Sequence, residues 1–180
     1  MLIVQPMATA IPQPAASTTS RHPASSRELA VDAQLCLALS TSSALVVKLY
    51  RKLLAPLGLT HPQYLILIVL LETRKAQTIG MIGTRLSLKT GSMTPLIKRL
   101  AAAGFIDKRR DADDDRKTWI SLTEKGIATQ SHLEAVREEV VRRLPLSSAG
   151  LECLTDELQR LNTALRPQFA PDGRPTAKRL

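Results

Sequence analysis

The chain has 180 residues, a formal net charge of +9 and only 3% aromatic residues. This length suits one domain with a real hydrophobic core, and the positive charge favours an anionic partner, either a nucleic acid or an acidic membrane surface. No apolar run approaches the roughly 20 residues of a spanning helix, and aromatic side chains that could stack on single-stranded bases are few. The composition therefore favours a nucleic acid over a membrane surface, and the alternative is that the charge merely aids solubility.

Both ends of the chain are predicted to be tails. Residues 1–24 carry four prolines among Ala, Ser and Thr and are predicted to be disordered, with Met7 as an alternative start. Residues 166–180, with three prolines and four basic side chains, are predicted to be a basic flexible tail. The N-terminus lacks the features of a secretory signal, so a cytoplasmic location is expected. Cys36 and Cys153 are too few and too far apart for a disulfide framework or zinc site, and we expect no metal and no cofactor.

A long first helix is predicted over about residues 28–54. A capping box, Ser25-Ser-Arg-Glu, precedes a run of periodic apolar residues. Asp32 is an alternative N-cap that would start the helix later. Pro56 and Gly58 are expected to end it.

Two short helices are predicted next. Thr60 is an N-cap with Pro62 in the first turn, and it opens an apolar helix over Gln63–Glu72. Thr78 caps the second helix, which is predicted to end at about Ser87.

The sixteen residues 89–104 are the most informative stretch of the chain. Small hydroxylated residues open a predicted amphipathic helix over about 91–103, and Gly104 suits the left-handed position that ends it. Lys98 and Arg99 lie on this helix and can reach a DNA backbone or guanine edges, although a merely solvated basic face is the alternative. A hydroxyl-rich helix start of this kind is typical of the recognition helix of a helix-turn-helix.

A basic hairpin is predicted directly after this helix. Residues 105–110 and 117–122 alternate like paired strands, with the acidic turn Asp111–Asp115 between them. Residues 85–117 carry nine basic and five acidic side chains, a net charge of +4. A recognition helix followed by a basic β-ribbon is typical of a winged helix-turn-helix, in which the ribbon contacts the backbone or minor groove.

The candidate DNA-binding residues come from both elements. Ser92 and Thr94 can donate hydrogen bonds to phosphates or bases. Arg116 at the hairpin tip is the best candidate for the minor groove, and Asp114 is expected to orient it by an ion pair. Trp119 is expected to pack within the wing. The full set of candidates is Thr90, Gly91, Ser92, Thr94, Pro95, Lys98, Arg99, Asp114 and Arg116.

Two further helices are predicted to close the domain. The first spans about residues 124–144 and ends before Pro145. Ser147 or Ser148 caps the last helix, which is predicted to end at about Leu165. Its leucines have a 3-4-3-4 spacing and form a single stripe: Leu151, Leu154, Leu158, Leu161 and Leu165.

The leucine stripe and the apolar first helix need more cover than a small winged core can supply. The economical arrangement is a two-fold homodimer that packs the helices at about 28–54 and 124–165 together. Such a dimer would bind a pseudo-palindromic operator. The alternative is a long helix folded back on its own domain. We therefore predict a mainly α protein with a small β-hairpin wing, in which a winged helix-turn-helix at about 60–122 lies inside a domain over residues 25–165.

The chain resembles the MarR family of winged-helix regulators over roughly residues 30–165, and within it the organic hydroperoxide resistance regulators. The resemblance implies a homodimeric repressor that leaves its operator when one cysteine near the start of the first helix is oxidised by an organic hydroperoxide. By position this cysteine is Cys36, and Tyr50 matches a partner-subunit tyrosine that hydrogen-bonds the thiolate. The matching segments are Gln34-Leu-Cys-Leu-Ala-Leu39, Lys48 to Tyr64, Gly91 to Leu100, Asp114-Asp-Arg116 and Ser121-Leu-Thr123.

Two substitutions depart from that subgroup. Ser40 and His61 stand where the subgroup usually has tyrosines. A serine is a shorter donor, and a protonated His61 would stabilise a thiolate more than a phenol does. Cys36 and Tyr50 are fourteen residues apart, about 21 Å along a helix. They cannot meet within one subunit but can meet across an antiparallel dimer contact.

The surroundings of Cys36 depend on where the first helix begins. If the helix starts at Asp32, Cys36 lies near the positive helix end, which favours a thiolate. If it starts at Ser25, Cys36 lies too far from that end for this stabilisation. The two-cysteine subgroup has its resolving cysteine in the helix predicted here over 124–144, which has none. Cys153 is therefore a substitute resolving cysteine or a bystander thiol.

Two other functions fit parts of the sequence. A thiol peroxidase would also use a reactive cysteine, but it needs a resolving thiol and usually a thioredoxin-like framework, and the chain has no Cys-x-x-Cys. An enzyme is therefore not expected. The serious alternative is a MarR-type regulator that binds a small aromatic or phenolic ligand near His61 and Tyr64. Cys36 would then be inert, which is the usual fate of a lone cysteine.

Overall fold

The computed structural model describes residues 34–114 and 117–169, and these residues fall into two units, residues 1–43 and 44–180. The first unit contributes only the start of one helix to the described part. Several sequence-based predictions lie outside the described residues: the tail at 1–24, the start at Met7, the caps at Ser25 and Asp32, Arg116, and the tail beyond residue 169.

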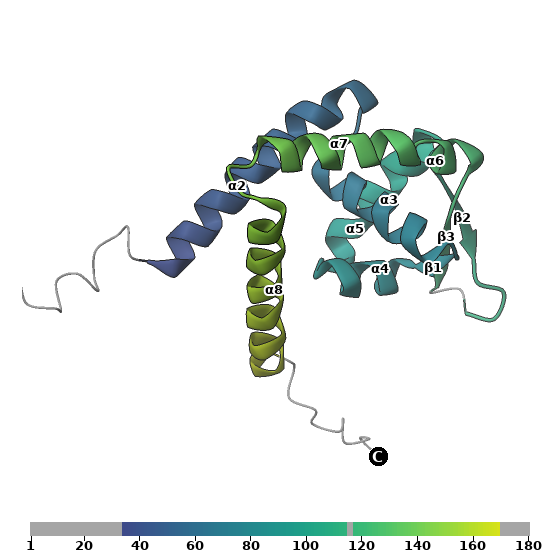
Figure 1. The fold of residues 1–180 in the computed structure, drawn as a ribbon. Coiled ribbons are helices and arrows are strands. Elements are labelled where there is room, and N and C mark those ends of the chain that lie inside the picture. The colour runs from purple at the N-terminus through teal and green to yellow at the C-terminus, as the bar shows by residue number, and fades with distance from the viewer. Residues whose placement is uncertain (1–33, 115–116, 170–180) are drawn as a thin grey trace, which may run out of the picture. The chain divides into compact units, whose positions relative to one another are not determined.

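The described chain is mostly helical, with a small antiparallel sheet (Figure 1). The predicted fold class is therefore confirmed. No single helix among these residues is both long and apolar enough to cross a bilayer. The elements are α2 Leu35–Leu54, the 3-10 turn η2 Ala55–Leu57, α3 His61–Thr73, β1 Gln77–Thr78, α4 Ile79–Leu86, α5 Thr90–Ala102, β2 Ile106–Arg110, β3 Thr118–Leu122, α6 Glu124–Ala128, α7 Gln130–Arg143, α8 Ser148–Leu165 and the 3-10 turn η3 Arg166–Phe169.

Local signals end α2 and start α3 as predicted. Pro56 lies in the 3-10 turn after α2, and Gly58 takes a left-handed φ of 65°, which favours glycine. Gln63 Oε1 accepts a hydrogen bond from the backbone N–H of Thr60 at 2.9 Å. This bond satisfies one of the free N–H groups at the helix start, so α3 begins at His61.

The pair α4 and α5 forms the helix-turn-helix. Thr78 Oγ1 accepts a hydrogen bond from Met81 N at 3.2 Å and starts α4. A Cβ on Gly83 would lie 2.9 Å from the carbonyl oxygen of Leu88, so the tight turn into α5 needs a glycine there. Gly104 follows α5 with a left-handed φ of 75°, as predicted.

The sheet has three strands in the order β1-β3-β2, all antiparallel. The predicted hairpin is confirmed as β2 and β3. Strand β1 is not predicted by the sequence pattern; its two residues, Gln77 and Thr78, pair with Ile120 and Trp119 of β3. A strand this short carries no alternation pattern, so only its tertiary pairing defines it.

The helix predicted over residues 124–144 is wrong as a single element, because the structure divides it at Thr129 into α6 and α7. The Thr129 hydroxyl donates to the carbonyl oxygen of Lys125 at 2.8 Å, a contact that bends helices. Thr123 Oγ1 accepts from Gly126 N at 3.1 Å and donates to the carbonyl oxygen of Gly104 at 2.6 Å. The start of α6 is thereby tied to the end of α5.

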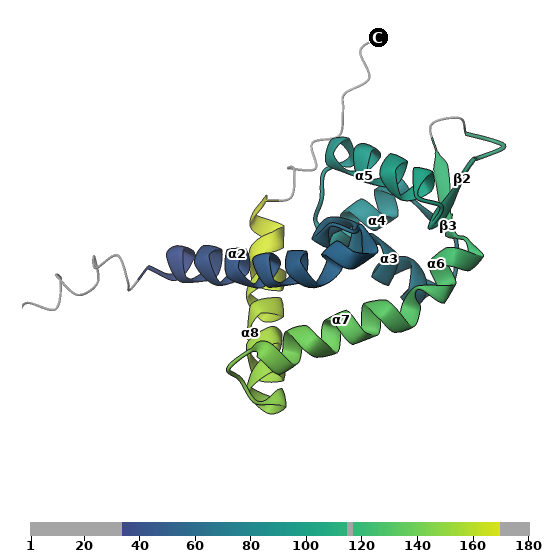
Figure 2. The ribbon, with the colours of Figure 1, turned by 90° about the horizontal axis from the view of Figure 1, so that it is seen from above.

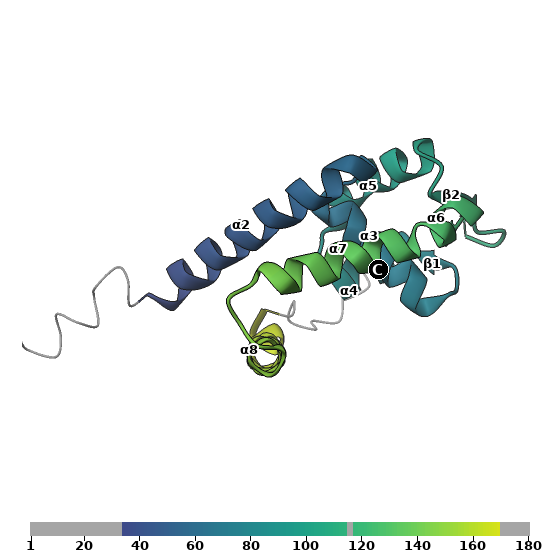
Figure 3. The same ribbon diagram turned by 45° about the horizontal axis from the view of Figure 1, so that its top comes forward.

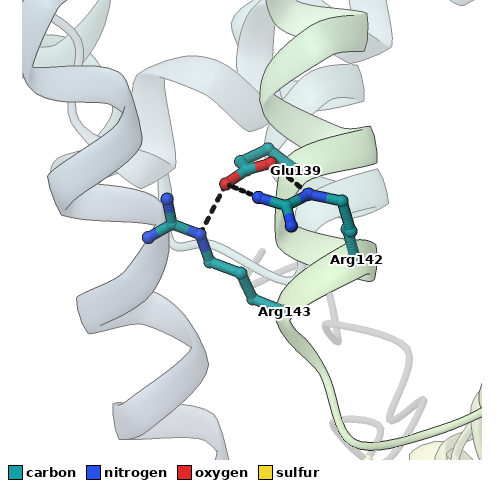
Figure 4. A network of polar contacts seen from close by, with 3 residues as sticks. All are labelled: Glu139, Arg142 and Arg143. Carbon is teal, nitrogen blue, oxygen red and sulfur yellow. Dashed lines mark hydrogen bonds and ion pairs between the residues drawn. The ribbon is translucent and has the colours of Figure 1, made fainter.

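The last turn of α7 carries a charge cluster (Figure 4). Glu139 accepts hydrogen bonds from Nε and Nη2 of Arg142 at 2.7 Å and from Nε of Arg143 at 2.6 Å. These bonds hold the pKa of Glu139 at about 2. The two guanidinium groups also lie near the negative end of the helix, which favours cations.

The core lies between α3, α4, α5, the sheet and α7, and α7 lies over α3 (Figure 3). By contrast, α8 has no buried residue. Ser147 Oγ accepts from Gly150 N at 3.1 Å and is therefore the cap of α8. The chain stays regular for one 3-10 turn after α8, over Arg166–Phe169, inside the stretch predicted to be tail. The fully buried core side chains are Leu54, Ile66, Leu67, Leu70, Ile82, Met93, Ile97, Leu100, Ile106, Ile120 and Leu133.

Candidate functional site

The predicted recognition helix α5 has one buried and one exposed face. Met93, Ile97 and Leu100 are buried in the core. The candidates on the helix whose exposure is described all face outward: Gly91, Ser92, Thr94, Pro95, Lys98 and Arg99. Thr90 is the first residue of the helix. The outward face of α5 therefore carries Ser92 and the cations Lys98 and Arg99, which can reach an external partner.

Asp111 organises the turn of the wing, a role that the sequence analysis did not assign. Its Oδ2 accepts from Trp119 Nε1 at 2.5 Å, and its Oδ1 accepts from the backbone N–H groups of Asp113 and Asp114 at 3.0 and 3.1 Å. These bonds hold the pKa of Asp111 below its usual value, and the bond from Trp119 has the largest effect. The detectable signal was an Asp followed by turn residues, because Asp side chains bind backbone N–H groups two and three residues later.

Trp119 is thus bound within the wing, as predicted. Asp114 forms an ion pair with Lys117, with Nζ and Oδ2 3.4 Å apart. Arg116 lies outside the described residues, so its ion pair with Asp114 stays a prediction.

Cys36 lies on the first turn of α2 as the structure describes it. The carbonyl oxygen of Gln34 accepts from Ala38 N at 3.1 Å, which is the first helical hydrogen bond among the described residues. The side chains of Cys36 and Cys153 are both exposed, and both are free thiols. The hydroxyl of Ser40 donates to the carbonyl oxygen of Leu37 at 3.0 Å, so its proton is used within its own helix.

Tyr50, His61 and Tyr64 form an aromatic cluster between α2 and α3. The ring centroid of Tyr50 lies 4.7 Å from that of His61 and 5.2 Å from that of Tyr64. Burial lowers the pKa of His61, and burial followed by contact with Tyr50 raises the pKa of Tyr64. His61 therefore favours its neutral form, which weighs against a protonated imidazole as the group that stabilises a thiolate.

A buried core, a tight helix-turn-helix, an exposed polar face on the second helix and an adjacent β-hairpin define a winged helix-turn-helix protein of the DNA-binding class. Residues 48–133 match the family described as transcriptional regulator SarA/Rot. The chain is also 34% identical over 147 residues to the HTH-type transcriptional regulator TtmR of Methylorubrum extorquens (strain PA1), covering 82% of this chain and 75% of TtmR.

Two further similarities agree. The chain is 37% identical over 133 residues to the organic hydroperoxide resistance transcriptional regulator of Bacillus subtilis (strain 168), covering 73% of this chain and 84% of that protein. It is 30% identical to the solved structure of reduced AbfR bound to DNA, with a TM-score of 0.68, covering 81% of this chain and 99% of AbfR. The chain belongs to the HTH-type transcriptional regulators that these relatives represent.

Proposed function

We propose that the protein is a homodimeric repressor that leaves its operator when Cys36 is oxidised by an organic hydroperoxide. The observation that carries this proposal is the exposed free thiol of Cys36 on the first turn of α2. Support comes from the relatives: one is an organic hydroperoxide resistance regulator, and AbfR has solved structures in reduced, overoxidised and disulfide-formed states.

The chemistry needs only the thiol and the peroxide. The thiolate of Cys36 attacks the terminal oxygen of the hydroperoxide, an S–O bond forms and the O–O bond breaks. The sulfur loses two electrons, the peroxide is reduced to its alcohol, and the product on the protein is a sulfenic acid after proton transfer. A second thiol, either Cys153 of the protein or a small thiol, then converts the sulfenic acid to a disulfide with loss of water.

The proposed dimer accounts for apolar surface that one subunit leaves uncovered. Leu45 on α2 is 61% exposed and Leu154 on α8 is 47% exposed, and every residue of α8 is at least partly exposed. Large apolar side chains exposed on helices in this way are typical of an interaction site. A two-fold pairing through terminal helices buries it and presents two copies of α5 about one helical turn of DNA apart.

Release follows from this geometry. The two α5 helices bind together only while the dimer keeps their spacing. Because Cys36 lies on a proposed dimerisation helix, a new oxygen or disulfide on its sulfur disturbs that contact. The oxidised dimer then no longer matches the half-site spacing of the operator.

Operator release can be measured by fluorescence anisotropy with a duplex selected by the reduced protein from a random-sequence library. After a slight excess of cumene hydroperoxide, we expect the wild type to lose at least about tenfold in affinity, because oxidation removes the two-site contribution. Cys36→Ser should stay bound. Cys153→Ser is the matched control, since it removes the other exposed thiol and should still be released.

The opposite results would reject the redox mechanism. A wild type that remains bound after oxidation, or a Cys36→Ser variant that is released as readily, contradicts it. Release of both proteins by a small aromatic acid, with no response to peroxide, would instead support the ligand-responsive alternative with an inert Cys36. A reductant should restore binding of the wild type if the oxidised product is a disulfide.

A further inference from the structure

The chain turns from the recognition helix into the wing within three residues. Because α5 ends at Ala102 and β2 begins at Ile106, the direction of the chain changes over residues 103–105, which we call the junction. Gly104, in its middle, takes a left-handed φ of 75°. Figure 2 shows α5 beside the β2–β3 hairpin, with α6 following β3 at the base of the hairpin. The conformation of the junction therefore helps to set the angle between α5 and the wing.

All three carbonyl oxygens of the junction accept a hydrogen bond from the start of α6. That of Ala103 accepts from Nζ of Lys125 at 2.7 Å. That of Gly104 accepts from the hydroxyl of Thr123 at 2.6 Å, and that of Phe105 accepts from the backbone N–H of Thr123 at 3.1 Å. The last carbonyl groups of a helix have no partner within it, so bonds from a second element can hold the chain there.

Lys125 contacts the junction on both sides of Gly104. Its ammonium binds Ala103 on the helix side and lies over the ring of Phe105 on the strand side, 4.6 Å from the ring centroid. Its stem covers the glycine between them, since a Cβ on Gly104 would lie 3.8 Å from Cδ of Lys125. A cation is favoured both at the negative end of a helix and over an aromatic face. One charged side chain thus joins the end of the recognition helix to the residue that enters β2.

We propose that Lys125 is a positioning residue for DNA binding, whose ammonium holds α5 and the wing at the angle at which both contact one duplex. A helix in the major groove and a ribbon beside it bind together only if their mutual orientation fits the DNA. This role needs no contact between Lys125 and the DNA. The inference rests on the DNA-binding part of the proposed function and not on its redox step.

The size of the effect follows from the population of the binding-competent arrangement. The apparent affinity falls in proportion to the fraction of molecules in which α5 and the wing keep the required angle. An exposed cation–π contact shifts such an equilibrium by about two- to fivefold, and the bond to Ala103 acts in the same direction. Removing the charge of Lys125 should therefore weaken operator binding by about two- to fivefold or slightly more.

The angle is measured on the full-length reduced protein without DNA, from residual dipolar couplings of the backbone amides of α5, β2 and β3. Lys125→Met removes the charge and the donor but keeps a side chain of similar length, and Lys125→Gln is a second neutral variant that decides the outcome if the first does not fold. Lys125→Arg restores a cation and a donor. Lys75→Met is the matched control, since it removes an exposed lysine from the loop between α3 and β1.

In the wild type we expect one alignment tensor to fit the amides of α5, β2 and β3. In Lys125→Met and Lys125→Gln the couplings of the two strands should shrink or need a different tensor, and affinity for the library-selected duplex should fall by about two- to fivefold. Lys125→Arg should restore both the couplings and the affinity. Lys75→Met should match the wild type in both measurements.

Three results would overturn the proposal. The first is an unchanged angle in the neutral variants: with a loss of affinity, it would mean that Lys125 contacts DNA directly. The second is a changed angle with unchanged affinity, and the third is a failure of Lys125→Arg to restore the angle or an equal change in Lys75→Met. If the variants behave as expected but peroxide does not release the wild type, only the redox proposal fails.

Discussion

At the residue scale, Asp111 holds the turn of the wing together. Its carboxylate binds the indole of Trp119 and two backbone N–H groups at the turn. Because these bonds favour the ionised form, the pKa of Asp111 is lowered on folding. The ionised carboxylate therefore stabilises the turn above the ordinary pKa, and this contribution is lost as pH falls through the lowered value.

Trp119 fluorescence should report this transition, because the chain has one tryptophan. In the wild type we expect the emission to change on acidification with a midpoint below the ordinary pKa of 3.8. Asp111→Asn should show no such step, since an amide carries no charge to titrate. Asp113→Asn is the control, because its backbone N–H still donates to Asp111. If the emission of Asp111→Asn changes on acidification with the same midpoint as that of the wild type, the indole contact does not order the wing.

His61 shows how far a residue can be interpreted before its neighbours are known. The sequence has a histidine where the resemblance implies a tyrosine. It leaves the protonation state of that histidine open. The structure places the imidazole against Tyr50 and Tyr64, where burial lowers its pKa. The protonation state of a histidine depends on its burial, and burial depends on how the helices pack together. No local sequence pattern therefore predicts the protonation state of His61.

At the element scale, α6 is held against the hairpin by a contact that only glycine permits. A Cβ on Gly126 would lie 2.1 Å from the carbonyl oxygen of Phe105 and 3.0 Å from Cδ2 of Leu122. The backbone of α6 therefore lies directly on the chain that enters β2. This contact connects the wing to α6, which leads into α7.

Gly126→Ala should destabilise the fold by about 1–3 kcal/mol, the usual cost of forcing extra volume into a packed contact. Thermal unfolding of the reduced protein measures it as a lower Tm. Gly91→Ala is the control: Gly91 is also helical and a Cβ there meets nothing within 4 Å. That change should stabilise the fold by up to about 1 kcal/mol. Equal Tm values for the two variants would contradict the close approach of α6.

At the scale of the whole molecule, the leucine stripe of α8 is the surface that the proposed dimer would bury. The stripe lies on a helix without any buried residue, so charged substitutions there leave the core of the subunit intact. Any effect of such variants on assembly can therefore be separated from an effect on folding.

Leu154→Glu combined with Leu161→Glu should convert the proposed dimer to monomers. Burying a leucine contributes about 1.5–3 kcal/mol, so the dimer dissociation constant should rise by at least about a hundredfold. Sedimentation equilibrium measures this change, and affinity for the selected duplex should fall with it. Thr163→Glu on the opposite face of α8 is the control. If the double variant sediments like the wild type, α8 does not form the interface.

The sequence by itself determined the local framework. The ends of α3, α4 and α8, the turn at Gly104 and the two-faced character of α5 follow from caps, glycines and apolar spacing, which act within a few residues. The net charge, which favours an anionic partner, is also known from the sequence, because it depends on composition and not on contacts between residues.

Only the tertiary structure decided which distant residues act together. The pairing of β1 with β3, the break at Thr129 and the bond from Trp119 to Asp111 all depend on contacts between separate elements. The contacts of Lys125 with Ala103 and Phe105 are of the same kind, because they join the start of α6 to the end of α5. A local sequence pattern specifies a helix or strand and its buried and exposed faces. The element against which each face packs is decided only when the elements come together in the tertiary structure.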